Sequence, residues 1–149
     1  MQIIPLGSGK CSYFGGAADT GVGPHEGLGL IEPTDLNDWW FRRIFVMGSG
    51  VWDSGKGLAR NLDPNASYCA MRWAYGSFAG IYGEILHGYS REQVRRAIIV
   101  IEANGNRMFS QAADWGPNTD TGRLIDLSPG DCKRLGVVTD DVVTVSAIL

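Results

Sequence analysis

The sequence predicts a mainly β fold, in which short strands and one- or two-turn helices build a small barrel. Three observations carry this prediction. The apolar run at residues 97–103 is followed by Asn104-Gly105 and a second strand pattern, which is typical of an antiparallel hairpin. Glycine supplies 21 of the 149 residues, which favours turns over long helices. The chain ends on the strand pattern VVTVSAIL, and several short strands with a terminal strand indicate a barrel.

The length and composition predict one globular domain over residues 1–149. A chain of this length can bury one hydrophobic core and is too short for two domains. It has 44% hydrophobic residues, 19% charged residues and a net charge of −3, so no nucleic-acid partner is expected. No apolar segment approaches the roughly 20 residues that span a bilayer, so no membrane partner is expected either.

The first ten residues show no export signal, and the cysteines show no disulfide or metal-binding pattern. Residues 1–10 lack a basic stretch followed by an apolar run, so the sequence predicts no Sec-type export and a cytoplasmic location, unless a phage virion or lysis route delivers the chain to a cell wall. Cys11, Cys69 and Cys132 are odd in number and have no CxxC spacing. We interpret them as reduced and structural, with pairing of two of them left open, and expect no metal and no cofactor.

The first half of the chain gives the weaker element predictions. Residues 11–30 are typical of a short strand, a glycine-rich loop and a possible return strand. Residues 31–66 are the least legible part: 35–47 fits a short helix or a strand, and an irregular surface excursion is expected at 48–65. Residues 67–73 predict a strand.

Two short helices have clear boundaries. Ser90 and Gln93 are spaced as a capping box, with Val94 on the inner face of the helix that follows. Between the hairpin and the second helix we expect a turn at 114–118 and an extended segment at 122–128.

The second helix begins after Ser128 as N-cap, with Pro129 at its first position and Asp131 in its first turn. It ends at Gly136, where a C-terminal cap belongs.

Two motifs in this order resemble one group of families. The segments DWGP at 114–117 and GRLIDLS at 122–128, within residues 94–149, look like the core of rare lipoprotein A-like and bacterial expansin-like domains. The segment SYFGG at 12–16 resembles the aromatic-glycine opening of the same families. The resemblance implies a six-stranded double-psi β-barrel with short helices, in which 31–66 is a glycine-rich insertion or a replaced, irregular section.

The resemblance implies a catalytic role for two aspartates. Asp114 takes the place of the aspartate that lytic transglycosylases of this type need, and Asp126 takes the general-acid position of expansins and related glycoside hydrolases. Paired carboxyls suit glycoside cleavage, because one carboxylate raises the pKa of the other and so favours a proton donor. The structural alternative is that Asp114 bonds its own turn and Asp126 serves the helix entry.

Aromatic side chains are the natural complement of such a pair, because sugar rings stack on exposed aromatic faces. Trp115 is the first candidate for such a platform, followed by Tyr13, Trp73 and Tyr75; each has a core position as its alternative. The transglycosylases also use a glutamate and a histidine in Thr-Ala-Ser-Gly-Glu and Ala-His segments that this chain lacks. His25-Glu26 is the nearby substitute, and we include Glu26 among the candidate substrate-binding residues, with a solvated loop pair as the alternative.

Three functions follow from this pattern. The first is cleavage of peptidoglycan glycan strands through Asp114, and the second is an expansin-like polysaccharide-binding module without catalysis. The third is a structural barrel in a phage-tail-like assembly, with protein partners at residues 39–40. The C-terminal segment also looks like the barrel signature of molybdopterin-dinucleotide domains and of AAA ATPase N-domains, which lack the aspartate pair and rank lower.

Overall fold

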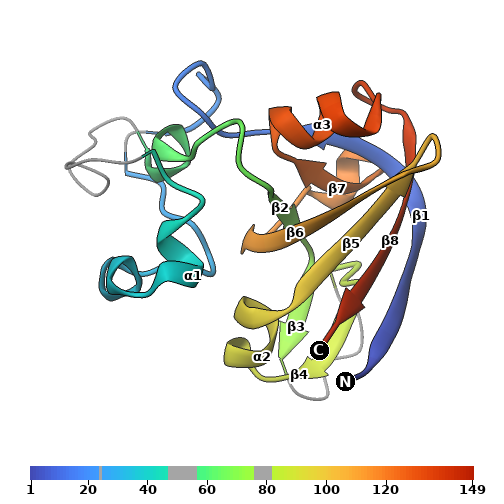
Figure 1. The fold of residues 1–149 in the computed structure, drawn as a ribbon, viewed down its shortest axis with the longest axis horizontal. Coiled ribbons are helices and arrows are strands. Elements are labelled where there is room, and N and C mark those ends of the chain that lie inside the picture. Colours follow the sequence, from blue (N-terminus) through green and yellow to red (C-terminus); the bar gives the residue numbers. More distant parts are fainter. Residues whose placement is uncertain (24, 47–56, 76–81) are drawn as a thin grey trace.

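The prediction of a mainly β barrel is confirmed. The computed structural model describes residues 1–23, 25–46, 57–75 and 82–149, and six of its strands close into a mixed barrel in the order β1-β7-β2-β6-β5-β8 (Figure 1). The barrel strands are β1 (Ile3–Tyr13), β2 (Tyr68–Met71), β5 (Ile98–Ala103), β6 (Asn106–Asp114), β7 (Arg123–Leu127) and β8 (Val142–Ile148).

The barrel has an internal two-fold order. The β1/β7 and β2/β6 pairs are parallel, and the other four pairs are antiparallel. The first half of the barrel consists of β1, β2 and β5, and the second half of β6, β7 and β8. If β1 is exchanged with β6, β2 with β7 and β5 with β8, every strand keeps the same neighbours around the barrel. A short helix precedes the last strand of each half, α2 (Arg91–Arg96) before β5 and α3 (Pro129–Leu135) before β8. The two helices lie at opposite ends of the barrel (Figure 1).

The hairpin of β5 and β6 forms as predicted. Asn104 and Gly105 both have positive φ, 53° and 76°, and they join strands whose last pair is Ala103 with Asn106. Two central residues of positive φ define the type I′ turn, whose twist matches that of antiparallel strands. The Asn104 amide also donates to the carbonyls of Leu135 and Gly136 at 2.9 and 3.0 Å, which ties the hairpin tip to the end of α3.

Gly105→Ala is expected to lower the free energy of unfolding by about 1 kcal/mol, because a Cβ disfavours positive φ. A Cβ at Gly105 meets nothing within 4 Å, so the change tests backbone conformation alone. Gly27→Ala is the matched control, since Gly27 also has open space around it and no positive φ. Urea unfolding measures both variants, and equal midpoints for the two would contradict the turn assignment.

Both predicted helix caps are present. Ser90 Oγ accepts from the backbone N–H of Gln93 at 3.2 Å, and the Ser90 N–H donates to Gln93 Oε1 at 2.8 Å. Ser128 Oγ accepts from the N–H of Asp131 at 3.1 Å, and Gly136 ends α3 in the left-handed conformation. These local signals place both helices without reference to the rest of the fold.

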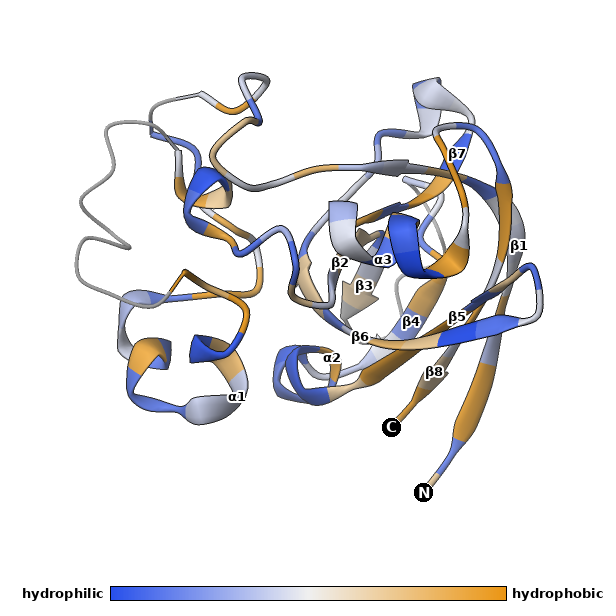
Figure 2. Cartoon of the chain, turned by 45° about the horizontal axis from the view of Figure 1, so that its top comes forward, coloured by the Kyte–Doolittle hydropathy of each residue, from blue (hydrophilic) through white to orange (hydrophobic). Residues whose placement is uncertain are grey.

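A side lobe packs against the barrel wall. We define it as residues 28–46 and 57–66, which hold the short helices η1 (Pro33–Asn37), α1 (Trp39–Arg42) and η2 (Leu58–Asn61). It has an apolar cluster separate from that of the barrel interior, and Figure 2 shows hydrophobic residues along the chain around α1. The buried members of the cluster from the lobe are Leu28, Ile31, Phe41, Ile44, Phe45, Leu58, Ala59 and Leu62, and Tyr68 of β2 and Ala113 of β6 join them from the barrel wall. The open choice at the start of 31–66 therefore resolves to helix, and the surface excursion expected for 48–65 is wrong at 58–62; residues 47–56 lie outside the described part.

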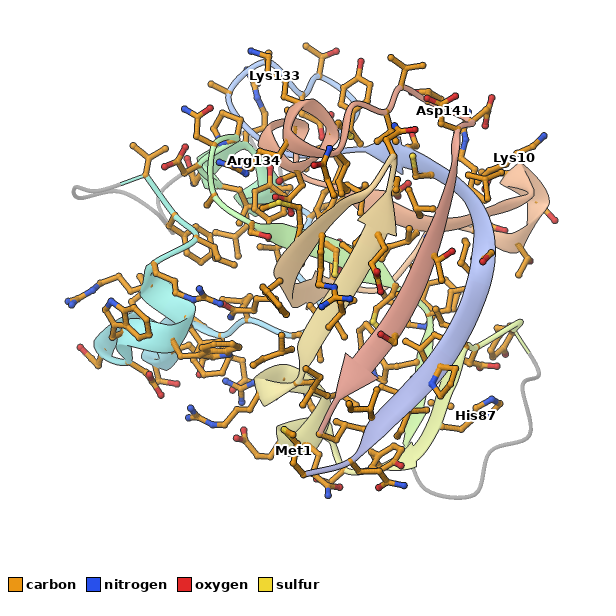
Figure 3. All side chains as sticks on the ribbon, turned by 45° about the vertical axis from the view of Figure 1, so that its right-hand side comes forward. Met1, Lys10, His87, Lys133, Arg134 and Asp141 are labelled. Carbon is orange, nitrogen blue, oxygen red and sulfur yellow. The ribbon has the colours of Figure 1, made fainter. Side chains whose placement is uncertain are left out.

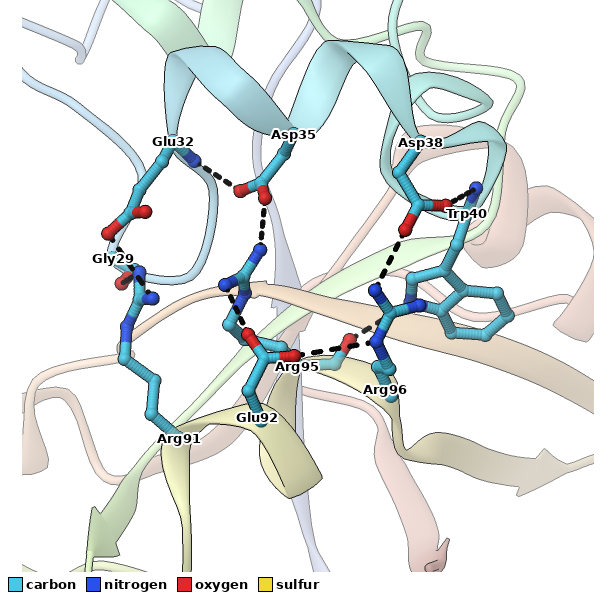
Figure 4. Close-up of polar contacts among 9 residues, drawn as sticks. All are labelled: Gly29, Glu32, Asp35, Asp38, Trp40, Arg91, Glu92, Arg95 and Arg96. Carbon is cyan, nitrogen blue, oxygen red and sulfur yellow. Dashed lines mark hydrogen bonds and ion pairs between the residues drawn. The ribbon is translucent and has the colours of Figure 1, made fainter.

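Three arginines on α2 bind the side lobe (Figure 4). Arg95 is buried and pairs with Asp35 of η1 and with Glu92 of its own helix. Arg96 pairs with Asp38 at 2.8 Å. Because its partner Asp35 belongs to the lobe, the buried pair fixes the lobe against α2.

The third of these arginines, Arg91, contacts the loop before η1. Arg91 pairs with Glu32 at 3.3 Å and donates to the carbonyl of Gly29 at 3.2 Å. It therefore holds the backbone at Gly29 in place, beside the end of β6.

Three element predictions need correction. The first strand starts at Ile3 rather than at residue 11, because β1 pairs along β8 over most of its length. The possible return strand before Leu30 is only a single bridge between Leu28 and Ile31. The strand at 67–73 breaks at Arg72, after which β3 (Trp73–Tyr75) pairs in parallel with an unpredicted β4 (Leu86–Tyr89) outside the barrel.

The barrel interior is apolar. Its fully buried side chains include Cys11, Cys69, Met71, Val94, Ile99, Ile101, Ala112, Ile125, Leu127, Leu135 and Ala147. Lys133 and Arg134 of α3 lie at the end opposite Met1 and His87 (Figure 3). The three cysteines are free, with Cys132 partly exposed. In the described ranges no helix has the length and apolar character to cross a membrane.

Candidate functional site

The barrel places Asp114 and Asp126 on either side of one residue. Asp114 ends β6, Asp126 lies in β7, and both have Ala70 of the intervening strand β2 as their register partner. Side chains of laterally paired residues share a face of the sheet, and two strand spacings separate their Cα atoms by roughly 10 Å. The small side chain of Ala70 leaves the space between the two carboxyls open.

A bulge contributes to this arrangement. The register of β2 with β6 passes from Cys69–Ala112 to Ala70–Asp114, which leaves Ala113 as the extra residue. Such a bulge bends the strand and redirects the side chain that follows it. The bulge therefore brings Asp114, rather than Ala113, opposite Ala70.

The two aspartates line one pocket of about 280 Å³. It lies where the ends of β1 and β6 meet the loop after β1. Its lining residues are Tyr13, Phe14, Asp19, Gly21, Val22, Glu26, Gly27, Ala59, Ala70, Asp114, Trp115 and Asp126. Four carboxyl groups and three aromatic rings therefore face one small space, with no basic side chain among them.

Asp114 is held by backbone amides. Its Oδ1 accepts from the N–H groups of Gly29 and Trp115, both at 2.8 Å. The pKa of Asp114 is raised above its ordinary value, because burial is the largest effect; the two amide bonds oppose this rise, and the negative charge of Glu26 adds to it. Because the amides favour the carboxylate form, they orient this group and support its negative charge.

Asp126 has a different environment. Burial raises its pKa from the ordinary value of 3.8 to about 6, the charge of Arg123 lowers it, and the charge of Asp114 raises it. Among the described residues no hydrogen bond or ion pair to the Asp126 carboxyl is found. A partly buried carboxyl of raised pKa with no fixed partner is the form that a proton donor takes.

Arg72 ties together the segments that carry the two aspartates. It is buried, and its Nη1 donates to the carbonyls of Pro117 and Arg123, both at 2.9 Å. Its Nε donates to the carbonyl of Gly83 at 2.7 Å. Pro117 follows Asp114 in the turn, and Arg123 begins the strand of Asp126, so one guanidinium supports both sides of the site.

The aromatic candidates separate into two groups. Tyr13 and Trp115 line the pocket with 60% and 36% of their surface exposed. Trp73 is buried in the barrel core, and its carbonyl accepts from Trp115 Nε1 at 3.3 Å. Its backbone carbonyl thus helps to orient the Trp115 ring, and Trp73 is not among the residues that line the pocket. Tyr75 ends β3, and its side chain lies outside the described part of the structure.

The loop after β1 contributes one predicted and one unpredicted carboxyl. Glu26 lines the pocket, whereas the neighbouring His25 is exposed and does not. Asp19 was missed by the sequence analysis, although Asp19-Thr20-Gly21 is typical of an Asx turn. Its Oδ1 accepts from the Gly21 N–H at 3.0 Å and its Oδ2 from the Gly15 N–H at 2.7 Å. The turn signal predicts the bond with Gly21, but not the bond with Gly15 or the position of Asp19 on the pocket.

Within the described ranges, no group of three or more His, Cys, Asp or Glu side chains is placed to hold a metal ion. No protein-family model matches the chain, and a search of curated proteins finds no match.

Proposed function

We propose that this chain is a double-psi β-barrel domain that cleaves the glycan strands of peptidoglycan, with Asp126 as general acid and Asp114 as its carboxylate partner. The observation that carries the proposal is the shared pocket, in which Asp126 has a raised pKa and no fixed partner while backbone amides hold Asp114. The exchangeable order of the two barrel halves supports the double-psi topology. The DWGP and GRLIDLS segments carry the two aspartates and also the family resemblance.

The proposed reaction needs one proton donor and one proton acceptor. Asp126, protonated below about pH 6, gives its proton to the glycosidic oxygen as the C1–O bond breaks. Asp114 stabilises the positive charge that develops on the sugar ring. A hydroxyl of the same sugar then bonds to C1 and loses its proton to Asp114, which yields an anhydro-sugar without a water molecule. The general acid of the proposal is therefore Asp126 rather than Asp114, because two backbone amides bond to Asp114 and oppose the rise of its pKa, whereas no such bond opposes protonation of Asp126 among the described residues.

The remaining lining residues suit a sugar ligand. The exposed faces of Tyr13 and Trp115 offer stacking surfaces for sugar rings. Asp19 and Glu26 add carboxylate oxygens that accept hydrogen bonds from hydroxyl groups. An open pocket with aromatic walls and acidic groups therefore favours a polyhydroxylated chain over an anionic ligand.

A polysaccharide-binding module without catalysis is the second candidate. It is favoured by the absence of the Thr-Ala-Ser-Gly-Glu and Ala-His segments, which supply further active-site groups in the transglycosylases that the chain resembles. Binding requires the aromatic faces and the hydroxyl acceptors, but no raised pKa.

Asp126→Asn is expected to reduce release of anhydro-muropeptides from purified peptidoglycan by at least 10²-fold, because a general acid contributes about 10²–10⁴ to the rate. Mass spectrometry of the released fragments, with cosedimentation on sacculi, measures cleavage and binding on the same samples. Asp120→Asn is the matched control, since Asp120 is exposed and does not line the pocket. Wild-type release should also decline as the pH rises above about 6, where Asp126 loses its proton.

Each outcome of this experiment separates the candidates. Equal release by wild type and Asp126→Asn would remove Asp126 from the mechanism. Cosedimentation without release by wild type would establish the binding module, and neither release nor cosedimentation would exclude both candidates.

A further inference from the structure

Arg72 is a buried charge that the proposed reaction does not yet use. Only 7% of its surface is exposed. In the described part of the chain, its guanidinium donates to the uncharged backbone carbonyls of Gly83, Pro117 and Arg123, and no carboxylate of this part forms an ion pair with it. A buried cation is unfavourable unless a negative charge lies near it, so the surroundings of Arg72 need a carboxylate.

The strand pattern places Arg72 on the face of the sheet that carries the carboxylate pocket, as we name the pocket lined by the two aspartates. Met71 and Trp73, the chain neighbours of Arg72, both belong to the barrel core. Because side chains alternate along an extended chain, Arg72 points to the opposite face, as Ala70 does two positions earlier. Ala70 is the residue between the two aspartates, so the guanidinium lies beside the site.

Charged groups from several elements act on Asp126. Burial has the largest effect and raises its pKa to about 6. The charged groups around it are, in decreasing order of effect, Arg123, Asp114, Arg72 and Asp19, and Glu26 lines the same pocket. The two arginines lower the pKa of Asp126, and the two aspartates raise it. Both arginines therefore favour the carboxylate form of this group.

The two arginines differ in their other partners. Arg123 is partly exposed, and its Nε donates to Asp140 Oδ1 at 2.9 Å, so a second carboxylate offsets part of its charge. Arg72 has no such ion pair among the described residues. Burial lowers the pKa of Arg72, and the charge of Asp126 raises it more than that of Glu84 does. Asp126 is therefore the carboxylate with which the buried charge of Arg72 interacts most strongly.

We propose that Arg72 is a positioning residue of the cleavage site, whose charge stabilises the Asp126 carboxylate that remains after the proton has passed to the glycosidic oxygen. Its bonds to the carbonyls of Pro117 and Arg123 hold the same guanidinium between the segments of both aspartates, so one side chain fixes both charge and geometry. This inference rests on the proposed function and adds to it the residue that makes Asp126 a stronger acid.

NMR titration tests the link between Arg72 and Asp126 without substrate. In the wild-type protein the Nε–H resonance of Arg72 is expected to shift with a midpoint of about 6, because Asp126 gains its charge close to the guanidinium. The same resonance should show no step at this pH in Asp126→Asn. Absence of the step in the wild type, or its persistence in Asp126→Asn, would overturn the inference.

Two substitutions separate the charge of Arg72 from its bonds. Arg72→Gln removes the charge and keeps an amide that donates to a carbonyl, whereas Arg72→Lys keeps the charge. The titration midpoint of the Asp126 carboxyl carbon is expected to rise above about 6 in Arg72→Gln and to stay near the wild-type value in Arg72→Lys. A loosened structure would instead admit water to Asp126 and lower the midpoint, so the direction of the shift distinguishes lost charge from structural damage.

Cleavage should follow the same pattern. Release of anhydro-muropeptides is expected to fall by about 10- to 10²-fold in Arg72→Gln, since misplaced reacting groups lose rate on this scale, and its decline at high pH should move to a higher pH. Arg107→Gln is the matched control, because Arg107 is an exposed arginine of β6 that pairs with Glu102 and does not line the pocket. It should change neither the Asp126 midpoint nor release.

The outcomes distinguish this inference from the proposed function. An Asp126 midpoint that is unchanged or lower in Arg72→Gln, with cleavage by the wild type intact, would overturn the role of Arg72 alone. Linked titration of Arg72 and Asp126 in a wild-type protein that releases no fragments would overturn the proposed function and leave the electrostatic link in place. If circular dichroism shows that Arg72→Gln does not fold, the titrations of the wild type and of Asp126→Asn decide the question.

Discussion

Arg95→Met is expected to lower the free energy of unfolding by about 3–5 kcal/mol, because it leaves a buried carboxylate without its partner. The side chains of Arg95 and Asp35 are only 6% and 11% exposed. The guanidinium also lies over the ring of Phe41, 4.4 Å from its centroid, and pairs with Glu92. Methionine preserves much of the side-chain volume, so the loss reports the charge rather than a cavity. Urea unfolding followed by tryptophan fluorescence measures the change.

The neighbouring Arg96 is the matched control. It lies on the same helix and pairs with Asp38 of the same lobe, but its side chain is 52% exposed, and solvent weakens such pairs. Arg96→Met should therefore shift the unfolding midpoint far less than Arg95→Met. Equal shifts for the two variants would mean that the buried pair has no special weight in holding the lobe.

A second substitution separates two causes of the lost stability in Arg95→Met: the unpaired charge of Asp35 and the loss of the other contacts of Arg95. In Arg95→Met/Asp35→Asn the buried charge is removed together with its partner, so part of the lost stability should return. The free energy of unfolding of the double variant is compared with that of Arg95→Met. If it is lower by the whole amount that Asp35→Asn alone removes, the two residues act independently, and their ion pair does not fix the lobe against α2.

The sequence predicts those parts of the fold that depend on neighbours in the chain. The Asn104-Gly105 turn and the caps at Ser90 and Ser128 form from bonds within four residues. The part of β1 before residue 11 escapes prediction because most side chains of this strand are exposed. It has no alternation of apolar and polar residues, and it depends on pairing with β8 at the other end of the chain.

In the candidate site too, the sequence predicts the local features and misses the contacts between distant segments. The DWGP and GRLIDLS motifs identify Asp114 and Asp126, and the structure brings both to Ala70. The amide of Gly29 lies 85 positions from Asp114 and reaches it only because the side lobe is fixed on α2. No local pattern predicts such a contact. The two-fold order of the barrel is likewise absent from the sequence as a repeat, because it lies in strand pairing and not in residue identity.

Asp126→Asn is expected to raise the free energy of unfolding at pH 8 by about 1–3 kcal/mol. The pKa of Asp126 is about 6 in the folded protein, against 3.8 ordinarily, so the folded state binds this proton more tightly than the unfolded state. The stabilisation due to this proton is complete below about pH 3.8 and is lost as the pH rises through 6. A difference of this size corresponds to about 3 kcal/mol, which partial exposure of the carboxyl reduces.

Urea unfolding of wild type and Asp126→Asn at pH 4 and pH 8 measures the effect. The variant should be more stable at pH 8, where the wild-type carboxylate is charged and partly buried, and close to wild type at pH 4, where the folded carboxyl is neutral. Asp120→Asn, at an exposed position, should show no such dependence on pH.

This stability measurement tests the proposed mechanism in the absence of substrate. A general acid at position 126 needs a raised pKa, and the same raised pKa makes the charged form of Asp126 unfavourable in the folded protein. Higher stability of Asp126→Asn at pH 8 together with loss of cleavage would mean that one burial effect underlies both. If the two proteins unfold alike at both pH values, the pKa of Asp126 is ordinary. Asp126 would then be ionised at neutral pH, and the proton for the glycosidic oxygen would have to come from Asp114, whose two amide bonds oppose its protonation.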